Sequence, residues 1–184
     1  VAQRSSVDIK KTKKSFLEKA FKVFESNFLS ADELLKDDPD REWLSIEDFN
    51  EIKTLFIQEW AKRELDETLD SQQAAAVGAI NGDVLVVARA GSGKTRTLVT
   101  RAIFLQKHCG VPANNILLLA FNKDAALEMK NRFRETAGNS AGQVTFGTFH
   151  GVFYGIVCNT YHINGNNILS EEEPKYQAMM SALK

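Results

Sequence analysis

The sequence predicts an α/β fold with a parallel sheet, preceded by an all-helical N-terminal extension. Two observations lead to this prediction. Strand-like and helix-like segments alternate over residues 67–160, and such alternation is typical of parallel sheets with ligands at the carboxyl ends of the strands. In residues 1–66 the apolar side chains recur at the spacing typical of helices. Residues 161–184 form a third region, a connector followed by a new helix from about Glu171.

The N-terminal extension is expected to be a set of packed helices. One apolar stripe recurs at helical spacing and consists of Phe16, Leu17, Ala20, Phe21, Phe24 and Phe28. Capping boxes are predicted at Ser30–Glu33 and at Ser45–Asp48, the second of which opens a helix that runs to about Leu65. The first residues also carry a lysine cluster, namely Lys10, Lys11, Lys13, Lys14, Lys19 and Lys22. Such a run is usually a solvated face, with nucleic acid as the alternative.

The alternating region predicts three strands and three helices. In chain order these are a strand over Asp83–Ala88, a helix over Lys94–Cys109, a strand over Asn115–Phe121, a helix over Asp124–Thr136, a strand over Gln143–Phe146 and a helix over Phe149–Asn159.

Composition excludes several classes of protein. The chain is 43% hydrophobic and 26% charged, which describes a globular protein, and its net charge of −1 means that any nucleic acid must be held by a local patch. No run of eighteen apolar residues is present, so no membrane partner is expected. Cys109 and Cys158 lack metal-ligand spacing. We therefore expect reduced thiols in a cytoplasmic protein.

A glycine loop after the first predicted strand indicates a nucleoside triphosphate site. The residues expected to hold the polyphosphate are Ala90, Gly91, Ser92, Gly93, Lys94 and Thr95. Gly91 and Gly93 let backbone N–H groups approach phosphates without a Cβ in the way. Lys94 supplies charge for the β- and γ-phosphates, and Thr95 supplies a hydroxyl ligand for Mg²⁺. Position 88 is alanine, where the general pattern has glycine.

Two stretches together resemble the nucleotide-binding entrance of the UvrD/Rep/PcrA helicases of superfamily 1. They are Leu69-Asp-Ser-Gln-Gln-Ala-Ala-Ala-Val77 and Ala88-Arg-Ala-Gly-Ser-Gly-Lys-Thr95. The resemblance implies that Gln73 reads the adenine edge of ATP, which a primary amide can do. Gln73 also completes a capping box with Asp70, so capping is the alternative. Arg96 matches a family arginine that lies against adenine, or is a surface residue. Arg89 departs from the family glycine.

Two further motifs resemble the family's single-stranded DNA contacts. Leu118-Leu-Ala-Phe-Asn-Lys-Asp-Ala-Ala-Leu-Glu-Met-Lys130 is similar to motif Ia, and Thr145-Phe-Gly-Thr-Phe-His-Gly151 to motif Ib. The residues that the resemblance assigns to nucleic acid are Phe121, Asn122, Lys123, Thr148 and His150. Phe121 would offer a face for a base, and the others would donate to phosphate. Asp124 stands where the family usually has lysine.

The resemblance implies an incomplete RecA-like P-loop domain, the first motor domain of a helicase that steps 3′ to 5′ along single-stranded DNA. After Thr95 we find no apolar strand ending in Asp-Glu, the pair that in this family serves Mg²⁺ and water. The implied molecule is an amino-terminal piece that binds ATP and Mg²⁺ but hydrolyses ATP poorly. Residues 161–184 resemble the start of the family's helical insertion. Apolar surface beside the phosphate-loop strand should then stay exposed.

Two alternatives remain open from the sequence. The chain could be another P-loop ATPase, which would need neither Gln73 nor the Gly-Thr-Phe-His motif. It could also be a nucleotide-regulated module whose residues 1–66 dock a protein partner.

Overall fold

The computed structural model describes residues 6–138, 143–162 and 181, and the three segments 1–5, 139–142 and 163–184 apart from Ser181 lie outside this description. The elements in chain order are α1 (Ser6–Asn27), α2 (Ala31–Leu34), the 3-10 helix η1 (Arg41–Trp43), α3 (Ile46–Leu65), α4 (Ser71–Gly78), α5 (Lys94–Ile103), the π-helix η2 (Phe104–His108), the 3-10 helix η3 (Ala113–Asn115), β1 (Leu117–Ala120), α6 (Lys123–Ala137), β2 (Thr145–Thr148) and α7 (Phe149–Tyr161). The predicted connector and helix after residue 162 fall almost entirely outside the described residues.

Helices α1 to α3 form the N-terminal part, as the apolar stripe predicts. Phe16, Phe24 and Phe28 are buried and contact aromatic side chains of α3. The capping box at the start of α3 is confirmed, because the Ser45 hydroxyl accepts from the Asp48 N–H at 3.0 Å and the Asp48 carboxylate accepts from the Ser45 N–H at 3.3 Å.

The capping box predicted at Ser30 is wrong. Ser30 has φ −103° and ψ 7° instead of the extended conformation of a capping residue, and its side chain makes no cap hydrogen bond. The Ser30 N–H instead donates to Asn27 Oδ1 at 3.3 Å. The Ser-x-x-Glu pattern is too permissive to identify a cap when the turn before it is closed by another polar side chain.

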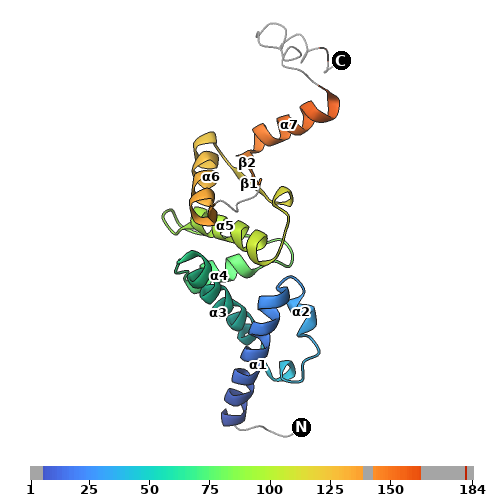
Figure 1. Cartoon of the computed structure of the whole chain (residues 1–184), viewed down its shortest axis with the longest axis vertical. Coiled ribbons are helices and arrows are strands. Elements are labelled where there is room, and N and C mark those ends of the chain that lie inside the picture. Colours follow the sequence, from blue (N-terminus) through green and yellow to red (C-terminus); the bar gives the residue numbers. More distant parts are fainter. Residues whose placement is uncertain (1–5, 139–142, 163–180, 182–184) are drawn as a thin grey trace.

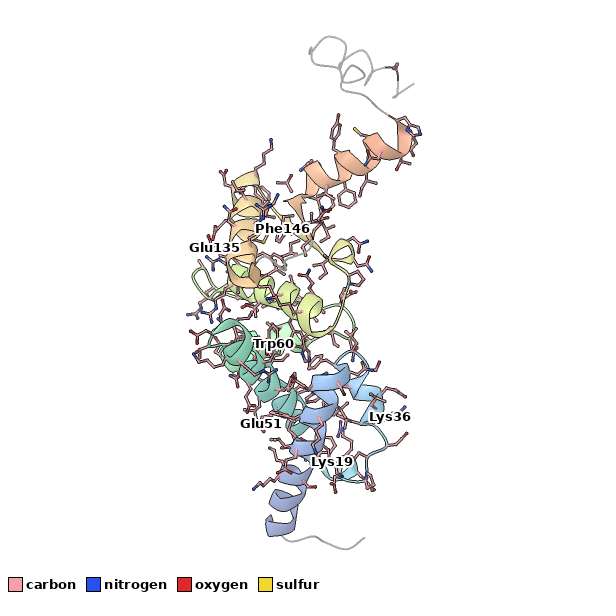
Figure 2. All side chains as sticks on the ribbon, viewed as in Figure 1. Lys19, Lys36, Glu51, Trp60, Glu135 and Phe146 are labelled. Carbon is pink, nitrogen blue, oxygen red and sulfur yellow. The ribbon has the colours of Figure 1, made fainter. Side chains whose placement is uncertain are left out.

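Two lysines of the predicted basic cluster are used inside the N-terminal part. Lys13 Nζ lies 2.7 Å from Asp48 and 2.8 Å from Glu51, which ties α1 to α3. Lys19, labelled in Figure 2, pairs with acidic residues of the segment between α2 and η1. These ion pairs neutralise part of the charge that would otherwise be offered to nucleic acid.

A single cluster of buried side chains continues from the N-terminal helices into the rest of the chain. Aromatic rings form the joint between these two parts of the chain. Phe104, at the start of η2, lies 4.8 Å from both Phe28 and Trp60, measured between ring centroids. Figure 2 shows Trp60 where the N-terminal helices meet α4 and α5. His108 stacks on Phe104 at 4.9 Å, and its Nε2 lies 2.7 Å from the Phe24 carbonyl oxygen.

The described sheet has two parallel strands. Leu117 to Ala120 of β1 pair in register with Thr145 to Thr148 of β2. Helix α6 connects them and packs on the sheet, with Phe133 5.3 Å from Phe146 between ring centroids. This β1-α6-β2 unit confirms the predicted alternation over this stretch, although β1 is shorter than the predicted strand over residues 115–121 and β2 begins and ends two residues later than the predicted strand over residues 143–146. The described chain is mostly helical, as an incomplete α/β domain would be.

The strand predicted over Asp83–Ala88 is wrong. The segment forms neither helix nor strand, and Val84, Leu85, Val86 and Val87 are 46%, 90%, 53% and 89% exposed. A strand needs a neighbouring backbone to accept and donate its hydrogen bonds, and none of the described segments pairs with this one. The apolar surface expected beside the phosphate loop is therefore exposed.

Helix α7 extends away from the rest of the described chain in Figure 1. Its described side chains include Phe149, Phe153, Tyr154 and Ile156, all of them exposed to a large extent, and none of its residues is buried. Over the described residues, none of the helices is both long and apolar enough to cross a membrane.

Candidate functional site

The glycine loop precedes α5, as predicted, and its two glycines adopt left-handed backbone. Gly91 has φ +77° and Gly93, the N-cap residue of α5, has φ +81°. Side chains with a Cβ rarely adopt this conformation. Between the glycines, the Ser92 N–H donates to the Arg89 carbonyl at 3.3 Å, which closes a tight turn. The loop therefore reaches the positive N-terminal end of a ten-residue helix, a position that favours anions.

Lys94 folds back over this loop. Its ammonium donates to the carbonyl oxygen of Ala88 at 3.1 Å and to that of Arg89 at 2.6 Å. Thr95 follows as the second residue of α5. Arg89, which replaces the family glycine, does not adopt positive φ and is exposed to solvent, so its side chain is accommodated without backbone strain.

Gln73 joins the start of α4 to the glycine loop. The predicted capping box is present: Asp70 Oδ1 accepts from the Gln73 N–H at 2.8 Å, and Gln73 Oε1 accepts from the Asp70 N–H at 3.2 Å. The same side chain donates from Nε2 to the Ser92 carbonyl at 3.1 Å. The capping role is therefore confirmed, and the amide is held against the loop at the same time. Its assignment to adenine remains a prediction.

Arg96 lies between Gln73 and the residues that follow α3. Its Nη2 donates to the Thr68 carbonyl and, at 3.4 Å, to Gln73 Oε1. Its Nε is buried, makes no hydrogen bond to the described residues, and lies 3.8 Å from the carboxylate of Glu67. Arg96 is therefore a partly exposed residue with several partners, and its assignment to adenine stays a prediction.

A cavity of about 560 Å³ lies against the glycine loop. Helix α4 contributes residues that include Gln73 and Ala76, α5 contributes residues that include Lys94, Thr97 and Arg101, and residues 82–84, 86–88 and 92 form a further part of the wall. Since cavities of this size accommodate cofactor-sized ligands, the space beside Lys94 suits a nucleotide. Its apolar wall is the exposed segment after Gly82.

Burial shifts the pKa values of two residues near the end of α5, Arg101 and Cys109. Arg101 donates to the carbonyl oxygens of Ala76 and Val77 at 2.7 and 3.1 Å, which satisfies the end of α4. Burial lowers the pKa of the Arg101 guanidinium. Burial also raises the pKa of the Cys109 thiol to about 12, although the nearby Arg101 acts in the opposite direction. Cys109 is therefore protonated at neutral pH and is a poor nucleophile.

The residues predicted to contact nucleic acid gather at one edge of the sheet. Because Ala120 pairs with Thr148 across two parallel strands, Phe121 and His150 follow the carboxyl ends of neighbouring strands. Phe121 is 99% exposed. Asn122 Oδ1 accepts from the Ala125 N–H at 2.8 Å and so caps α6.

Thr148 plays the same part for α7, accepting from the Gly151 N–H at 3.1 Å. Lys123 and His150 are exposed to solvent. The structure thus brings all five predicted residues to adjoining helix starts, and two of them have a capping role as well.

Sequence reasoning missed several residues around the site. Glu67 accepts a hydrogen bond of 3.0 Å from Thr100 of α5, and Arg101 of α5 donates to a carbonyl oxygen of α4. His108 lies in the aromatic joint beside Phe104. A buried threonine on an apolar helix face and an arginine on the same helix were the available signals.

Comparison with known proteins assigns residues 69–183 to a family model described as the UvrD/REP helicase N-terminal domain. YjcD of Bacillus subtilis (strain 168) is 39% identical over 120 residues, which cover 62% of this chain and 16% of the relative. DNA helicase II of Escherichia coli (strain K12) is 36% identical over 100 residues, which cover 54% and 14%.

The ATP-dependent DNA helicase PcrA of Staphylococcus epidermidis is 40% identical over 86 residues, which cover 47% of this chain and 12% of the relative. The matched part is thus a small share of each relative's length, at most 16% among these three.

Proposed function

Because the chain belongs to the UvrD/REP helicase N-terminal domain family, we propose that residues 67–160 are the ATP-binding part of the first motor domain of an ATP-dependent DNA helicase. In this proposal residues 1–66 are a helical N-terminal extension and residues 161–184 begin a helical insertion. The observation that carries it is the loop Gly91–Gly93, with two left-handed glycines, Lys94 folded over it and the Gln73 amide bonded to it. The alternative of an unrelated P-loop ATPase is not retained.

The chain's own groups fit an ATP–Mg²⁺ complex. Lys94 would exchange its two loop carbonyls for the β- and γ-phosphates, and the N–H groups from Ala90 to Gly93 would face the phosphate oxygens. Thr95 would supply a hydroxyl ligand to Mg²⁺, which neutralises phosphate charge when bound. Gln73 would read the base while its backbone N–H still donates to the capping carboxylate of Asp70. Lys94 thus binds and orients the polyphosphate while remaining near the positive end of α5.

Single-stranded DNA is proposed to cross the carboxyl edge of β1 and β2. Phe121 is fully available for stacking on a base, which does not depend on sequence. Lys123 and His150 would contact phosphates from the starts of α6 and α7. In the whole helicase, ATP binding and hydrolysis would close two RecA-like domains and drive 3′-to-5′ steps along the strand, whereas the 184 residues alone should hydrolyse ATP poorly.

Titration of the 184-residue chain with Mg²⁺ and a fluorescent ATP analogue tests the nucleotide site. Lys94→Ala should weaken binding about tenfold or more, because it removes a charge-assisted contact worth roughly 1.5–3 kcal/mol. Lys107→Ala, an exposed lysine on η2, is the matched control and should bind like the original chain. Absence of measurable binding by the original chain, or unchanged binding by Lys94→Ala, would refute the proposal.

Fluorescence anisotropy with a labelled oligothymidine tests the DNA edge separately. Phe121→Ala should weaken binding by about tenfold, since stacking on one aromatic ring contributes roughly 1–3 kcal/mol. Tyr161→Ala removes an exposed ring at the other end of α7 from His150 and serves as the control. Equal losses in both variants would show that the effect is not specific to this edge.

A steady-state ATPase assay with and without single-stranded DNA tests whether the 184-residue chain hydrolyses ATP poorly, as proposed. We expect little turnover in either condition, because the carboxylates of the family's Asp-Glu pair are not found after Thr95 in this sequence. Robust turnover stimulated by DNA would contradict the proposed division of function between this part and the rest of the helicase.

A further inference from the structure

Glu67 occupies a defined place between the N-terminal helices and the nucleotide site. Helix α3 ends at Asp66, which has φ +53°, and the Glu67 N–H donates to the Ala61 carbonyl at 3.1 Å. This turn reverses the chain and directs the Glu67 side chain toward α5. There its Oε2 accepts a hydrogen bond from the Thr100 hydroxyl at 3.0 Å. Because Thr100 is completely buried, this hydrogen bond fixes the position of the Glu67 carboxylate.

The same carboxylate oxygen faces Arg96. Arg96 Nε lies 3.8 Å from it and has no hydrogen-bond acceptor among the described residues, so attraction of opposite charges is what this nitrogen gains. Both side chains are only partly exposed, at 36% for Arg96 and 21% for Glu67, so solvent screens the pair less than a surface ion pair.

A continuous series of contacts then runs to the phosphate loop. Arg96 donates to Gln73 Oε1 at 3.4 Å, and Gln73 Nε2 donates to the Ser92 carbonyl at 3.1 Å. The groups proposed to face the nucleotide base are therefore fixed, through Arg96, by a carboxylate that lies outside the glycine loop.

We propose that Glu67 is a positioning residue for recognition of the nucleotide base. It does not touch the nucleotide. Its negative charge, oriented by Thr100, sets the position of the Arg96 guanidinium, and Arg96 in turn holds the Gln73 amide. This inference rests on the proposed function, since it assumes that ATP binds beside Gln73.

Glu67→Gln is the test, because the glutamine side chain keeps an oxygen for the Thr100 hydroxyl and loses only the charge. Affinities for ATP and for GTP, each with Mg²⁺, are measured by calorimetry on the whole 184-residue chain. ATP affinity should fall roughly threefold to tenfold, as expected for a partly screened ion pair, while GTP affinity stays unchanged. Glu64→Gln, which removes an exposed carboxylate of α3, is the matched control.

A second variant separates positioning from folding. In an Arg96→Ala background, Glu67→Gln should have no further effect on ATP affinity, because the charge would have nothing left to orient. Unchanged ATP affinity in Glu67→Gln overturns the inference. Equal losses for ATP and GTP together with a lower melting temperature also overturn it, since they indicate a structural role. If the original chain binds neither nucleotide, the proposed function itself is refuted, and the inference about Glu67 loses its basis.

Discussion

Phe104→Ala should detach the N-terminal helices from the helix that follows the phosphate loop. Phe104 is completely buried, and its ring lies 4.8 Å from Phe28 and Trp60 and 4.9 Å from His108, measured between centroids. Phe28 directly follows α1, Trp60 lies in α3, and His108 belongs to η2 together with Phe104. One ring thus joins η2 to two N-terminal segments that lie far from it in the sequence, and its removal leaves a cavity at their meeting point.

The expected loss is large for a single substitution. Truncation of a buried phenylalanine to alanine costs about 3–5 kcal/mol, and each well-oriented aromatic pair adds roughly 0.5–1.5 kcal/mol. Because measured phenylalanine-to-alanine losses already include such contacts, two edge-to-face contacts and one stacked contact put the expected loss in the upper part of that range, at about 4–5 kcal/mol. That is a substantial share of the roughly 5–15 kcal/mol that stabilises an ordinary domain.

Urea unfolding followed by circular dichroism and by tryptophan fluorescence measures this loss, and Trp60 reports directly on the joint. Phe121→Ala is the control, since the same residue type is 99% exposed there and the change should stay within about 0.5 kcal/mol. A loss below about 1 kcal/mol for Phe104→Ala, or equal losses in both variants, would refute the idea that this ring joins the two parts.

Three further predictions concern titration, reactivity and backbone strain. Cys109 should react slowly with iodoacetamide at pH 7.5 and much faster in urea, because burial raises its pKa to about 12 in the folded chain. Hydrogen bonding to Lys13 lowers the pKa of Asp48 below its usual 3.8, so this carboxylate stabilises the fold above that pH, and the contribution is lost as the pH falls through the lowered pKa. The melting temperature of Asp48→Asn should therefore be lower than that of the original chain at pH 7, and this difference should shrink below pH 4. Gly93→Ala should destabilise the chain more than Gly91→Ala, because both sites have positive φ but only at Gly93 would the new Cβ lie 2.9 Å from Gln73 Nε2; equal melting temperatures for the two variants would show that this contact does not matter.

Features that depend on neighbours in the chain were predictable from the sequence. The stripe from Phe16 to Phe24 lies in α1 with Phe28 directly after it, and Gly91 and Gly93 have the positive φ that the loop pattern requires. Helix spacing and glycine conformation are set within a few residues, so a local pattern specifies them. The capping box at Asp70 and Gln73 belongs to the same group, since both partners are three residues apart.

Features that depend on distant partners were not predictable. Residues 84–87 have the composition of a buried strand, yet a strand exists only when another backbone lies beside it, and here they are exposed. Glu67 looks like one more charged residue after a helix, and its role depends on Thr100 and Arg96, which approach only when α5 packs on α4. A pattern in the sequence cannot indicate which of many carboxylates will meet a buried hydroxyl.

The described contacts hold α5 from both ends, and this arrangement has a consequence for the nucleotide site. In the first turn of α5 the Arg96 guanidinium faces Glu67, which also accepts a hydrogen bond from Thr100 one turn later. Just beyond the end of α5, Phe104 and His108 pack against the N-terminal helices. A helix fixed at only one end could tilt and change the direction of its N–H groups at the loop. Because both contacts involve the N-terminal helices or the turn that ends them, we expect these helices to determine how rigidly the proposed phosphate loop is held. A change in their packing should then alter nucleotide affinity although the loop itself is unchanged.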